Sequence, residues 1–438
     1  MTENKEIRPI QNLITETDNN SRNKSVIKII LFVFMLALYF ISYFHRISVP
    51  GTIFNELQRD FNATATNISM LGAIFLYIYA GMQIFTGILV DKVGTTKVMI
   101  LAGIILAVGA ILFSFSTSLN ILYATRALLA FGASVIYLCL VKEITELFSS
   151  KNFAVFLSIV LVAGYLGGIA GTYPFERAVN FVGWRKSILI IGIITAVFIT
   201  GLILLYLRIK DKKVNSVKIS LENVASVIAN IFTFPIYASN CISFSICFVI
   251  QSSIGKKILE DCFGFNAKKA ASYIMVLAVL SMTGAGISGF VSKLIKNRRK
   301  PLIIFGSSAA LTFCILMVFA IKGQLGQYAL LPAFILLGLS SVALPMGTAC
   351  IKELNNRHIS ATAISFLNTA LYGAIAILVT ATGYIMDLFG NMTVKKGDAI
   401  IYPKEAYMAI FTLCLVLSIF SLFGAMLVKE TQGICLEN

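Results

Sequence analysis

The sequence predicts an all-α integral membrane protein with twelve transmembrane helices. Of its 438 residues, 58% are hydrophobic and only 13% are charged, whereas soluble globular chains have about 45–50% apolar and about 25% charged residues. Apolar runs recur along the whole chain, and they have the length of about 20 residues that a helix needs to cross a bilayer. This composition excludes a soluble globular domain and a disordered chain.

The apolar runs fall into two sets of six. The first set comprises 26–47, 69–90, 97–116, 119–141, 153–174 and 187–207, and the second comprises 232–254, 269–292, 301–320, 328–350, 359–386 and 406–428. The predicted organisation is a tail at 1–25, a six-helix half at 26–207, a linker at 208–230, a second six-helix half at 231–430 and a tail at 431–438. Within the linker, residues 217–228 place apolar side chains at the spacing of an amphipathic helix; a plain tether is the alternative.

The distribution of positive charge predicts the orientation. The net charge is +16, which fits cytoplasmic loops rich in Lys and Arg and does not require a nucleic-acid partner. With the N-terminus in the cytoplasm, most Lys and Arg residues lie on the cytoplasmic side, including the basic runs at 208–213 and 296–300. We therefore expect both termini in the cytoplasm.

The loop between the second and third spans carries the most specific motif. It reads Gly87-Ile-Leu-Val-Asp91-Lys92-Val-Gly94. Here Gly87 allows close helix contact, Asp91 can accept charge-assisted hydrogen bonds and Gly94 allows a tight turn. The motif resembles the signature G-x-x-x-D-[RK]-x-G of the major facilitator superfamily, which implies that these four residues form a conformational latch. A generic polar turn is the alternative.

The resemblance covers the chain from Val26 to about Glu430. It implies two pseudo-symmetric six-helix halves and secondary active transport by alternating access, not an enzyme, with no cofactor, no metal and a monomeric state. The first two spans are similar to bacterial permeases of the phagosomal-nutrient-transporter type. This similarity implies an inner-membrane protein that takes up a small polar solute, an amino acid or a nucleoside, of which the amino acid is preferred.

Other functions stay open from the sequence. They are an organic-anion or sugar-phosphate permease, a drug exporter, and a non-transporting sensor or receptor on the same fold. No phosphate-binding loop, zinc-protease motif or hydrolase triad is found. The expected partners are a small-molecule substrate, membrane lipids and a coupling proton.

Two arginines within spans are candidates for substrate binding, because a charge inside the membrane is costly and marks a functional site by default. Arg46 ends the first span, and Tyr43 with Arg46 resembles the Y-x-x-R of anion and amino-acid permeases. A snorkelling interfacial side chain is the alternative for Arg46. Arg126 lies in the fourth span, where a structural role bonding carbonyls of neighbouring helices is the alternative.

Uncharged polar residues within spans complete the predicted site, since substrates of such folds bind near the midplane. The candidates are Tyr77, Gln83, Asn240, Asn368 and Tyr372. Each of them could instead pair with another helix. No acidic residue is expected in mid-membrane, so His45 is the candidate for proton coupling, with a hydrogen-bonded interfacial histidine as the alternative.

The fifth span carries a stripe of small residues. It consists of Gly164, Gly167, Gly168, Gly171 and Pro174. Small residues three and four apart let helix backbones approach closely. The resemblance implies bending and sliding of this helix during alternating access; ordinary close packing is the alternative.

Overall fold

The computed structural model describes residues 7–147, 153–207, 230–355, 359–396 and 399–434. Among these residues, eleven helices are long and apolar enough to cross a membrane, and the number is twelve if the bent pair α6 and α7 counts as one span. The protein is thus an all-helical membrane protein with about twelve spans, as predicted. The linker at 208–229, with its predicted amphipathic helix, lies outside the described residues.

The first half runs from α1 to α8. Its helices are α1 (Ile7–Ser48), α2 (Phe54–Phe61), α3 (Ala65–Val93), α4 (Thr95–Ser114), α5 (Leu119–Leu147), α6 (Phe153–Ala170), α7 (Tyr173–Val182) and α8 (Trp184–Tyr206). Apart from the short α2 and α7, these helices pack as a bundle, with α4 against α5 and α8, and α1 against α6.

The second half runs from residue 231 to α17. Its seventh span consists of η2 (Ile231–Thr233), α10 (Phe234–Val249), the π-helical η3 (Ile250–Ile254) and α11 (Gly255–Phe263). The remaining elements are α12 (Ala267–Leu294), α13 (Lys300–Ile321), η4 (Gln327–Ala329), α14 (Leu330–Leu339), η5 (Ser340–Val342), α15 (Ala343–Glu353), α16 (Ser360–Leu388), η6 (Gly390–Met392), β1 (Val394–Lys396), β2 (Ala399–Ile401) and α17 (Lys404–Leu427). Strands β1 and β2 form an antiparallel hairpin in which Val394 pairs with Ile401.

Two elements differ from the prediction. Helix α1 begins at Ile7, upstream of the predicted start at 26, because residues 10–28 contain no glycine or proline that would end a helix, and Pro9 lies in the first turn, where proline is tolerated. The predicted fifth span, 153–174, is two helices, α6 and α7, bent by 42°. The break falls beside Gly171, and Pro174 lies in the first turn of α7, where proline is tolerated.

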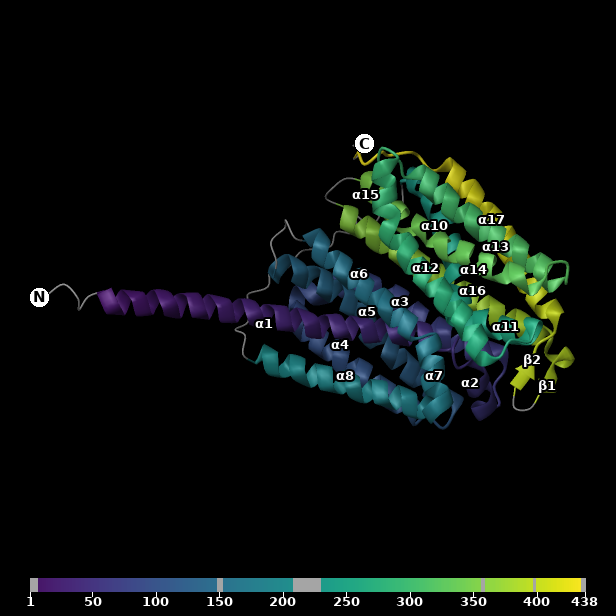
Figure 1. Ribbon diagram of the computed structural model, residues 1–438, viewed down its shortest axis with the longest axis horizontal. Helices are drawn as coiled ribbons and strands as arrows, with labels where there is room; N and C mark the ends of the chain where they lie inside the picture. Colours follow the sequence, from purple (N-terminus) through teal and green to yellow (C-terminus); the bar gives the residue numbers. More distant parts are fainter. Residues whose placement is uncertain (1–6, 148–152, 208–229, 356–358, 397–398, 435–438) are drawn as a thin grey trace, which may run out of the picture.

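The two halves meet mainly through α3 and α16. Helix α1 begins and α17 ends at the end of the bundle away from the β1–β2 hairpin (Figure 1). We call the hairpin end the outer end, in keeping with the predicted orientation. There, the backbone amides of Ala65 and Thr66, at the start of α3, donate to the carboxylate of Asp387 in α16, both at 2.8 Å. These hydrogen bonds hold the two halves together at the outer end of the interface.

Candidate functional site

Arg46 lies near the end of α1, yet its side chain reaches the interior between the halves. Side chains on a helix tilt toward its N-terminus, so the guanidinium points back along α1 toward the middle of the bundle. Arg46 is only 3% exposed, so it does not snorkel to solvent. Its Nη1 donates to the hydroxyl of Tyr372, at 2.8 Å, from α16 in the other half.

Aromatic faces surround this guanidinium. Its central carbon lies 4.1 Å from the ring centroid of Tyr79, 4.7 Å from that of Tyr43 and 5.3 Å from that of Tyr372. A cation over aromatic faces gains roughly 0.5–2 kcal/mol per good contact. These contacts bring together the predicted residues Arg46, Tyr43 and Tyr372, and they add Tyr79.

The charge of Arg46 is only partly compensated. Its Nε and Nη2 have no hydrogen-bond acceptor among the described residues. The ion pairs found among those residues also include none with Arg46. A buried cation with two unsatisfied donor groups is costly, and an acceptor for both donors would lower this cost.

The other predicted polar residues lie in different surroundings. Tyr77 is 42% exposed and has none of the Arg46 contacts that Tyr79 makes. The amide of Gln83 donates to the carbonyl of Ser134 at 3.5 Å. Asn240 is buried against Gly347 in α15, where its side chain has no hydrogen-bond partner among the described residues. Asn368 is half-buried in α16.

Arg126 has a different environment from Arg46. It is fully buried in α5, and each of its three nitrogens donates to a backbone carbonyl. Nε donates to Leu71 at 3.1 Å, Nη1 to His45 at 2.9 Å and Nη2 to Val49 at 2.6 Å. Its donors are thus occupied by α3, by α1 and by the turn after α1. This geometry matches the structural alternative, in which Arg126 holds helices together.

His45 precedes Arg46 in the sequence and contacts Arg126 in space. Its backbone carbonyl accepts from Arg126, and its ring packs edge-to-face on Phe44 at a centroid distance of 5.5 Å. The residue is fully buried, and neither ring nitrogen has a hydrogen-bond partner among the described residues.

The predicted glycine stripe faces α1. A Cβ added to Gly164 would lie 2.6 Å from the ring of Tyr39, and one added to Gly167 would lie 2.1 Å from the carbonyl oxygen of Phe40. Added Cβ atoms at Gly168 and Gly171 would lie 3.2 Å from Tyr43 and 3.1 Å from the carbonyl oxygen of Phe44. The stripe therefore lies against the same helix that carries Arg46.

We expect Gly167→Ala to destabilise the protein. The new methyl group would overlap the Phe40 carbonyl, so α6 and α1 must separate, which costs roughly 1–3 kcal/mol for overpacking. The measurement is the thermal unfolding midpoint in detergent. Gly81→Ala in α3 is the matched control, because nothing lies within 4 Å of its added Cβ and alanine is the better helix former. Equal midpoints for the two variants would contradict the close packing.

The predicted latch residues lie at the turn from α3 to α4. Lys92 is exposed near the end of α3, and Gly94 between the helices has a φ of +95°, a conformation that glycine adopts without strain. Gly87 and Asp91 lie in α3, and their surroundings are outside the described side chains.

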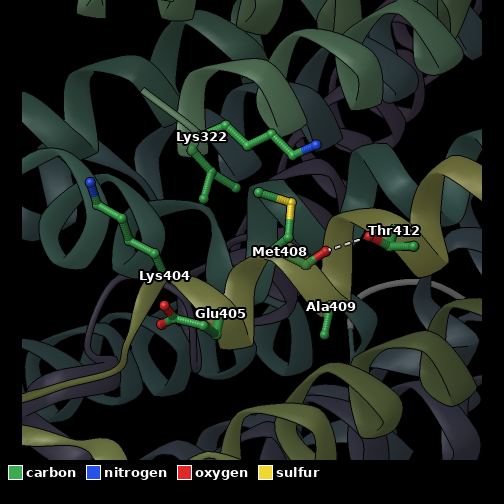
Figure 2. Close-up of a pocket in the computed structure, with 7 residues that line it drawn as sticks. Lys322, Lys404, Glu405, Met408, Ala409 and Thr412 are labelled. Carbon is green, nitrogen blue, oxygen red and sulfur yellow. Dashed lines mark hydrogen bonds between the residues drawn. The ribbon is translucent and has the colours of Figure 1, made fainter. Parts of the chain in front are cut away.

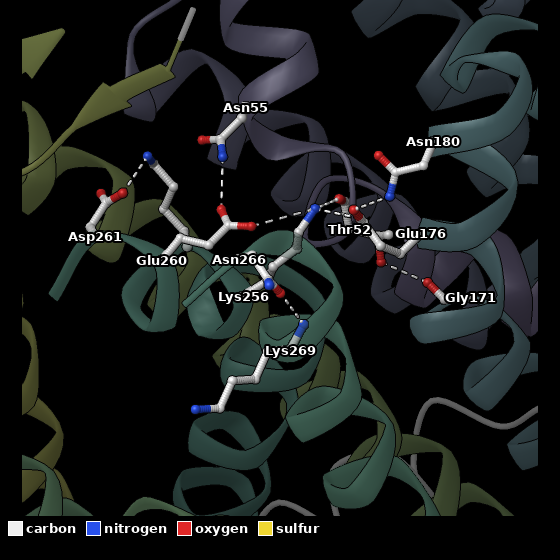
Figure 3. Close-up of polar contacts among 11 residues, drawn as sticks. Thr52, Asn55, Gly171, Glu176, Asn180, Lys256, Glu260, Asp261, Asn266 and Lys269 are labelled. Carbon is white, nitrogen blue, oxygen red and sulfur yellow. Dashed lines mark hydrogen bonds and ion pairs between the residues drawn. The ribbon is translucent and has the colours of Figure 1, made fainter. Parts of the chain in front are cut away.

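A second polar cluster closes the outer end between the halves (Figure 3). The ammonium of Lys256 in α11 pairs with the carboxylate of Glu176 in α7, donates to the carbonyl of Thr52 at 2.7 Å and lies 3.8 Å from Glu260. The amide of Asn55 donates to Glu260 at 2.7 Å. We call Glu56, Glu176, Lys256 and Glu260, with Asn55, the outer cluster.

Neighbouring contacts extend this closure. The ammonium of Lys257 pairs with Asp261 at 2.8 Å, and Asp261 also accepts from the hydroxyl of Tyr407 at 2.7 Å. The backbone amide of Gly51 donates to the carbonyl of Ser252 in η3 at 2.9 Å. A Cβ at Gly51 would lie 2.6 Å from the Ser252 backbone, so this approach requires glycine.

Sequence reasoning counted Tyr79 among the polar residues of the second span but did not place it in the site, and it did not select Lys256 or Lys257. The predicted seventh span ended at 254, so Lys256 and Lys257 looked like the start of a loop. The signal for a continuing helix was present, because each lysine has an acid four residues later, at Glu260 and Asp261.

A surface groove of about 620 Å³ lies at the outer ends of α13 and α17 (Figure 2). It is lined by Ile321, Lys322, Lys404, Glu405, Met408, Ala409 and Thr412. None of the predicted site residues lines it, so it is separate from the Arg46 site. Among the described residues, no group of His, Cys, Asp or Glu side chains could hold a metal ion.

Comparisons with known proteins agree with this architecture. Residues 35–378 match the family described as Major Facilitator Superfamily. A solved structure, a bacterial homologue of the human lysosomal transporter Spinster in an inward-facing and unoccupied conformation, superposes with a TM-score of 0.75 at 15% identity. The superposition covers 92% of this chain and 98% of that chain, so the fold is shared.

Relatives in sequence are distant and carry different cargoes. The chain is 26% identical to the multidrug resistance protein MdtM of Escherichia coli O157:H7 over 267 residues, 58% of this chain and 62% of that protein. It is 28% identical to the probable sulfoacetate transporter SauU of Cupriavidus necator over 163 residues, 37% of each protein. The matches therefore span less than two thirds of either relative.

Proposed function

The chain belongs to the major facilitator superfamily, whose members are transporters and not enzymes, and we propose that its cargo is a small organic anion whose carboxylate binds Arg46. Arg126, which the sequence also nominates for the substrate, is assigned a structural role in this proposal. Tyr43, Tyr79 and Tyr372 form the walls of the site. We further propose a location in a bacterial inner membrane, with both termini in the cytoplasm.

One observation carries this proposal. Arg46 is a buried cation at the contact between the halves, and its Nε and Nη2 have no protein acceptor among the described residues. A guanidinium binds a carboxylate through two parallel hydrogen bonds. The surrounding tyrosine rings favour a substrate with a compact apolar part next to its acid group. The similarity to a probable sulfoacetate transporter supports an anionic cargo.

The same site is less suited to two other cargoes. A cationic drug would meet the like charge of Arg46, although the chain is similar to a multidrug resistance protein. An amino acid would place its carboxylate on Arg46, but its ammonium would need a partner, and no described acidic side chain pairs at this site. Neither named relative is an amino-acid importer. We therefore place the organic anion first and the amino acid second.

We propose that the site also links the two halves. Arg46 belongs to the first half, and its hydrogen-bond partner Tyr372 belongs to the second. A carboxylate bound to Nε and Nη2 would share the guanidinium with the Tyr372 hydroxyl, which accepts from Nη1, and so change the bonding between the halves. The parts proposed to move are the latch at Gly87, Asp91, Lys92 and Gly94 and the stripe that runs along α6 to Pro174 at the start of α7. His45 is proposed as the residue through which a coupling proton acts.

Uptake into proteoliposomes tests the cargo. We expect saturable uptake of a labelled monocarboxylate or sulfonated carboxylate, such as lactate or sulfoacetate. We expect excess unlabelled anion to compete, and a neutral analogue of the same shape, such as the corresponding amide, not to compete. Uptake of amino acids with no anion uptake would select the second candidate, and export of cationic dyes alone would contradict an anionic cargo.

The same proteoliposomes test whether transport is coupled to a proton. An imposed inward proton gradient should stimulate uptake in the unmodified chain and not in His45→Gln, which keeps the size of the side chain but does not titrate. Stimulation that persists in His45→Gln would remove the coupling role from His45 and leave the anion proposal intact.

A further inference from the structure

The outer cluster contains more acids than bases. Three carboxylates share the cluster with one ammonium: Lys256 pairs with Glu176 and lies 3.8 Å from Glu260, and Glu56 follows Asn55, whose amide donates to Glu260. The neighbouring Lys257 and Asp261 neutralise each other. The cluster is also well shielded from solvent, because the side chains of Glu176, Lys256 and Glu260 are 1%, 5% and 13% exposed.

The three carboxylates are unequally compensated. Glu176 accepts from both Lys256 and the amide of Asn180, the latter at 2.9 Å. Glu260 accepts from Asn55 and lies 3.8 Å from Lys256, beyond hydrogen-bond distance. One oxygen of Glu56, Oε2, is buried without a hydrogen-bond partner among the described residues. Hydrogen bonds and one ammonium therefore do not balance three negative charges.

Carboxylates crowded together in a poorly hydrated site do not all ionise, and the group as a whole retains a proton. We propose that the outer cluster is a proton-binding site, centred on Glu260, which takes up a proton from the external solution when the outer end closes. The site lies at the outer end, and closure shields it, so it takes up and releases its proton on that side. It is therefore a sensor of external pH, distinct from a transported proton.

The arrangement of the halves explains why uptake accompanies closure. Glu56 and Glu176 belong to the first half, whereas Lys256 and Glu260 belong to the second. Separation of the halves at the outer end would disperse the carboxylates and return each of them to water. Because the closed state then binds more protons than the open state, acid stabilises closure, and a rise in external pH favours opening.

The other charged groups near Glu260 do not take over its role as the proton-binding group. The charged groups that interact electrostatically with Glu260 are Lys256, Lys257, Glu176 and Glu56. On the adjoining elements, Lys269 of α12 places its ammonium over the Phe265 ring, 3.8 Å from the centroid. Arg177 of α7 and Lys404 of α17 are exposed to solvent.

The experiment measures the distance across the outer end. Spin labels are attached at Phe181→Cys and Tyr328→Cys, in a background whose native cysteines are replaced by serine or alanine. These residues are 90% and 87% exposed and lie in opposite halves. Pulsed electron–electron double resonance in nanodiscs then gives the ratio of closed to open populations at pH values from about 5.5 to about 8.5, a range above the ordinary pKa of a glutamate side chain.

We expect the closed-to-open ratio to fall as the pH rises, by at most about tenfold per pH unit for one proton. Glu260→Gln mimics the protonated acid, so it should remain closed and lose the pH response. Glu405→Gln is the matched control, because this acid is exposed at the outer end and lies outside the cluster; it should respond as the unmodified chain does. A ratio that does not change with pH, or a response that survives Glu260→Gln, would overturn the proposal. The readout does not depend on the cargo.

Discussion

Arg46→Gln should abolish uptake while leaving the folded protein as stable as before, or more stable. Truncating a buried group that pairs with a charged ligand costs roughly 2–5 kcal/mol, so the ratio kcat/KM for the anion should fall by roughly 30-fold or more. The free protein, in contrast, loses a buried charge whose Nε and Nη2 have no partner among the described residues. Removing such a charge relieves a desolvation cost.

Two measurements separate these effects. Uptake into proteoliposomes reports the loss of function, and the thermal unfolding midpoint without substrate reports stability. Arg46→Lys keeps the charge but not the two-pronged geometry, so it should retain only a small part of the activity. Tyr77→Phe is the control, because Tyr77 is 42% exposed and makes none of the ring contacts described for Arg46. Normal uptake by Arg46→Gln would contradict the proposed site.

Arg126→Met should have the opposite profile, with a large loss of stability. Methionine fills a similar volume but donates no hydrogen bonds, so the carbonyls of His45, Leu71 and Val49 lose their charged donor. Hydrogen bonds from charged groups contribute about 1.5–3 kcal/mol each, and we expect a total cost of about 3 kcal/mol or more. The measurements are the thermal unfolding midpoint and the yield of folded protein.

Arg185→Met is the matched control for this loss. Arg185 also donates to two carbonyls, those of Ser114 at 3.1 Å and Ser116 at 2.7 Å. Its side chain is 38% exposed, so water can replace the lost donor, and the expected cost is below about 1 kcal/mol. If Arg126→Met retains the midpoint of the unmodified chain, the structural role of Arg126 fails and its role in substrate binding returns.

The organisation of the chain was accessible from sequence because it depends on local properties. A run of about 20 apolar residues specifies a membrane span wherever it occurs, so the number and order of spans followed directly. The boundaries were less accessible. The seventh span continued past 254. Lys256 is buried there through an ion pair with Glu176 of the other half, a partner that only the fold supplies, and Lys257 through an ion pair with Asp261, four residues later on the same helix. The fifth span is two helices, because the chain turns beside Gly171.

The candidate site was partly accessible for the same reason. Arg46, Tyr43 and Tyr372 were selected as polar groups in apolar surroundings, and the structure brings the three together. Tyr77 and Tyr79 are two positions apart on one helix, so their side chains point in directions that differ by more than half a turn. The sequence does not show which of the two faces the other half, and so Tyr79 was not preferred over Tyr77.

What the sequence determined by itself is the class of molecule, its twelve-span plan and the few polar residues that the membrane makes costly. These follow from the free energy of placing each residue type in an apolar medium. What only the tertiary structure decided is the role of each charge. Arg46 and Arg126 are the same residue type within spans. Arg46 lies among aromatic rings and has donors without an acceptor among the described residues, whereas all three nitrogens of Arg126 donate to backbone carbonyls. Their partners come from helices far apart in the chain, so the difference arises only when those helices pack.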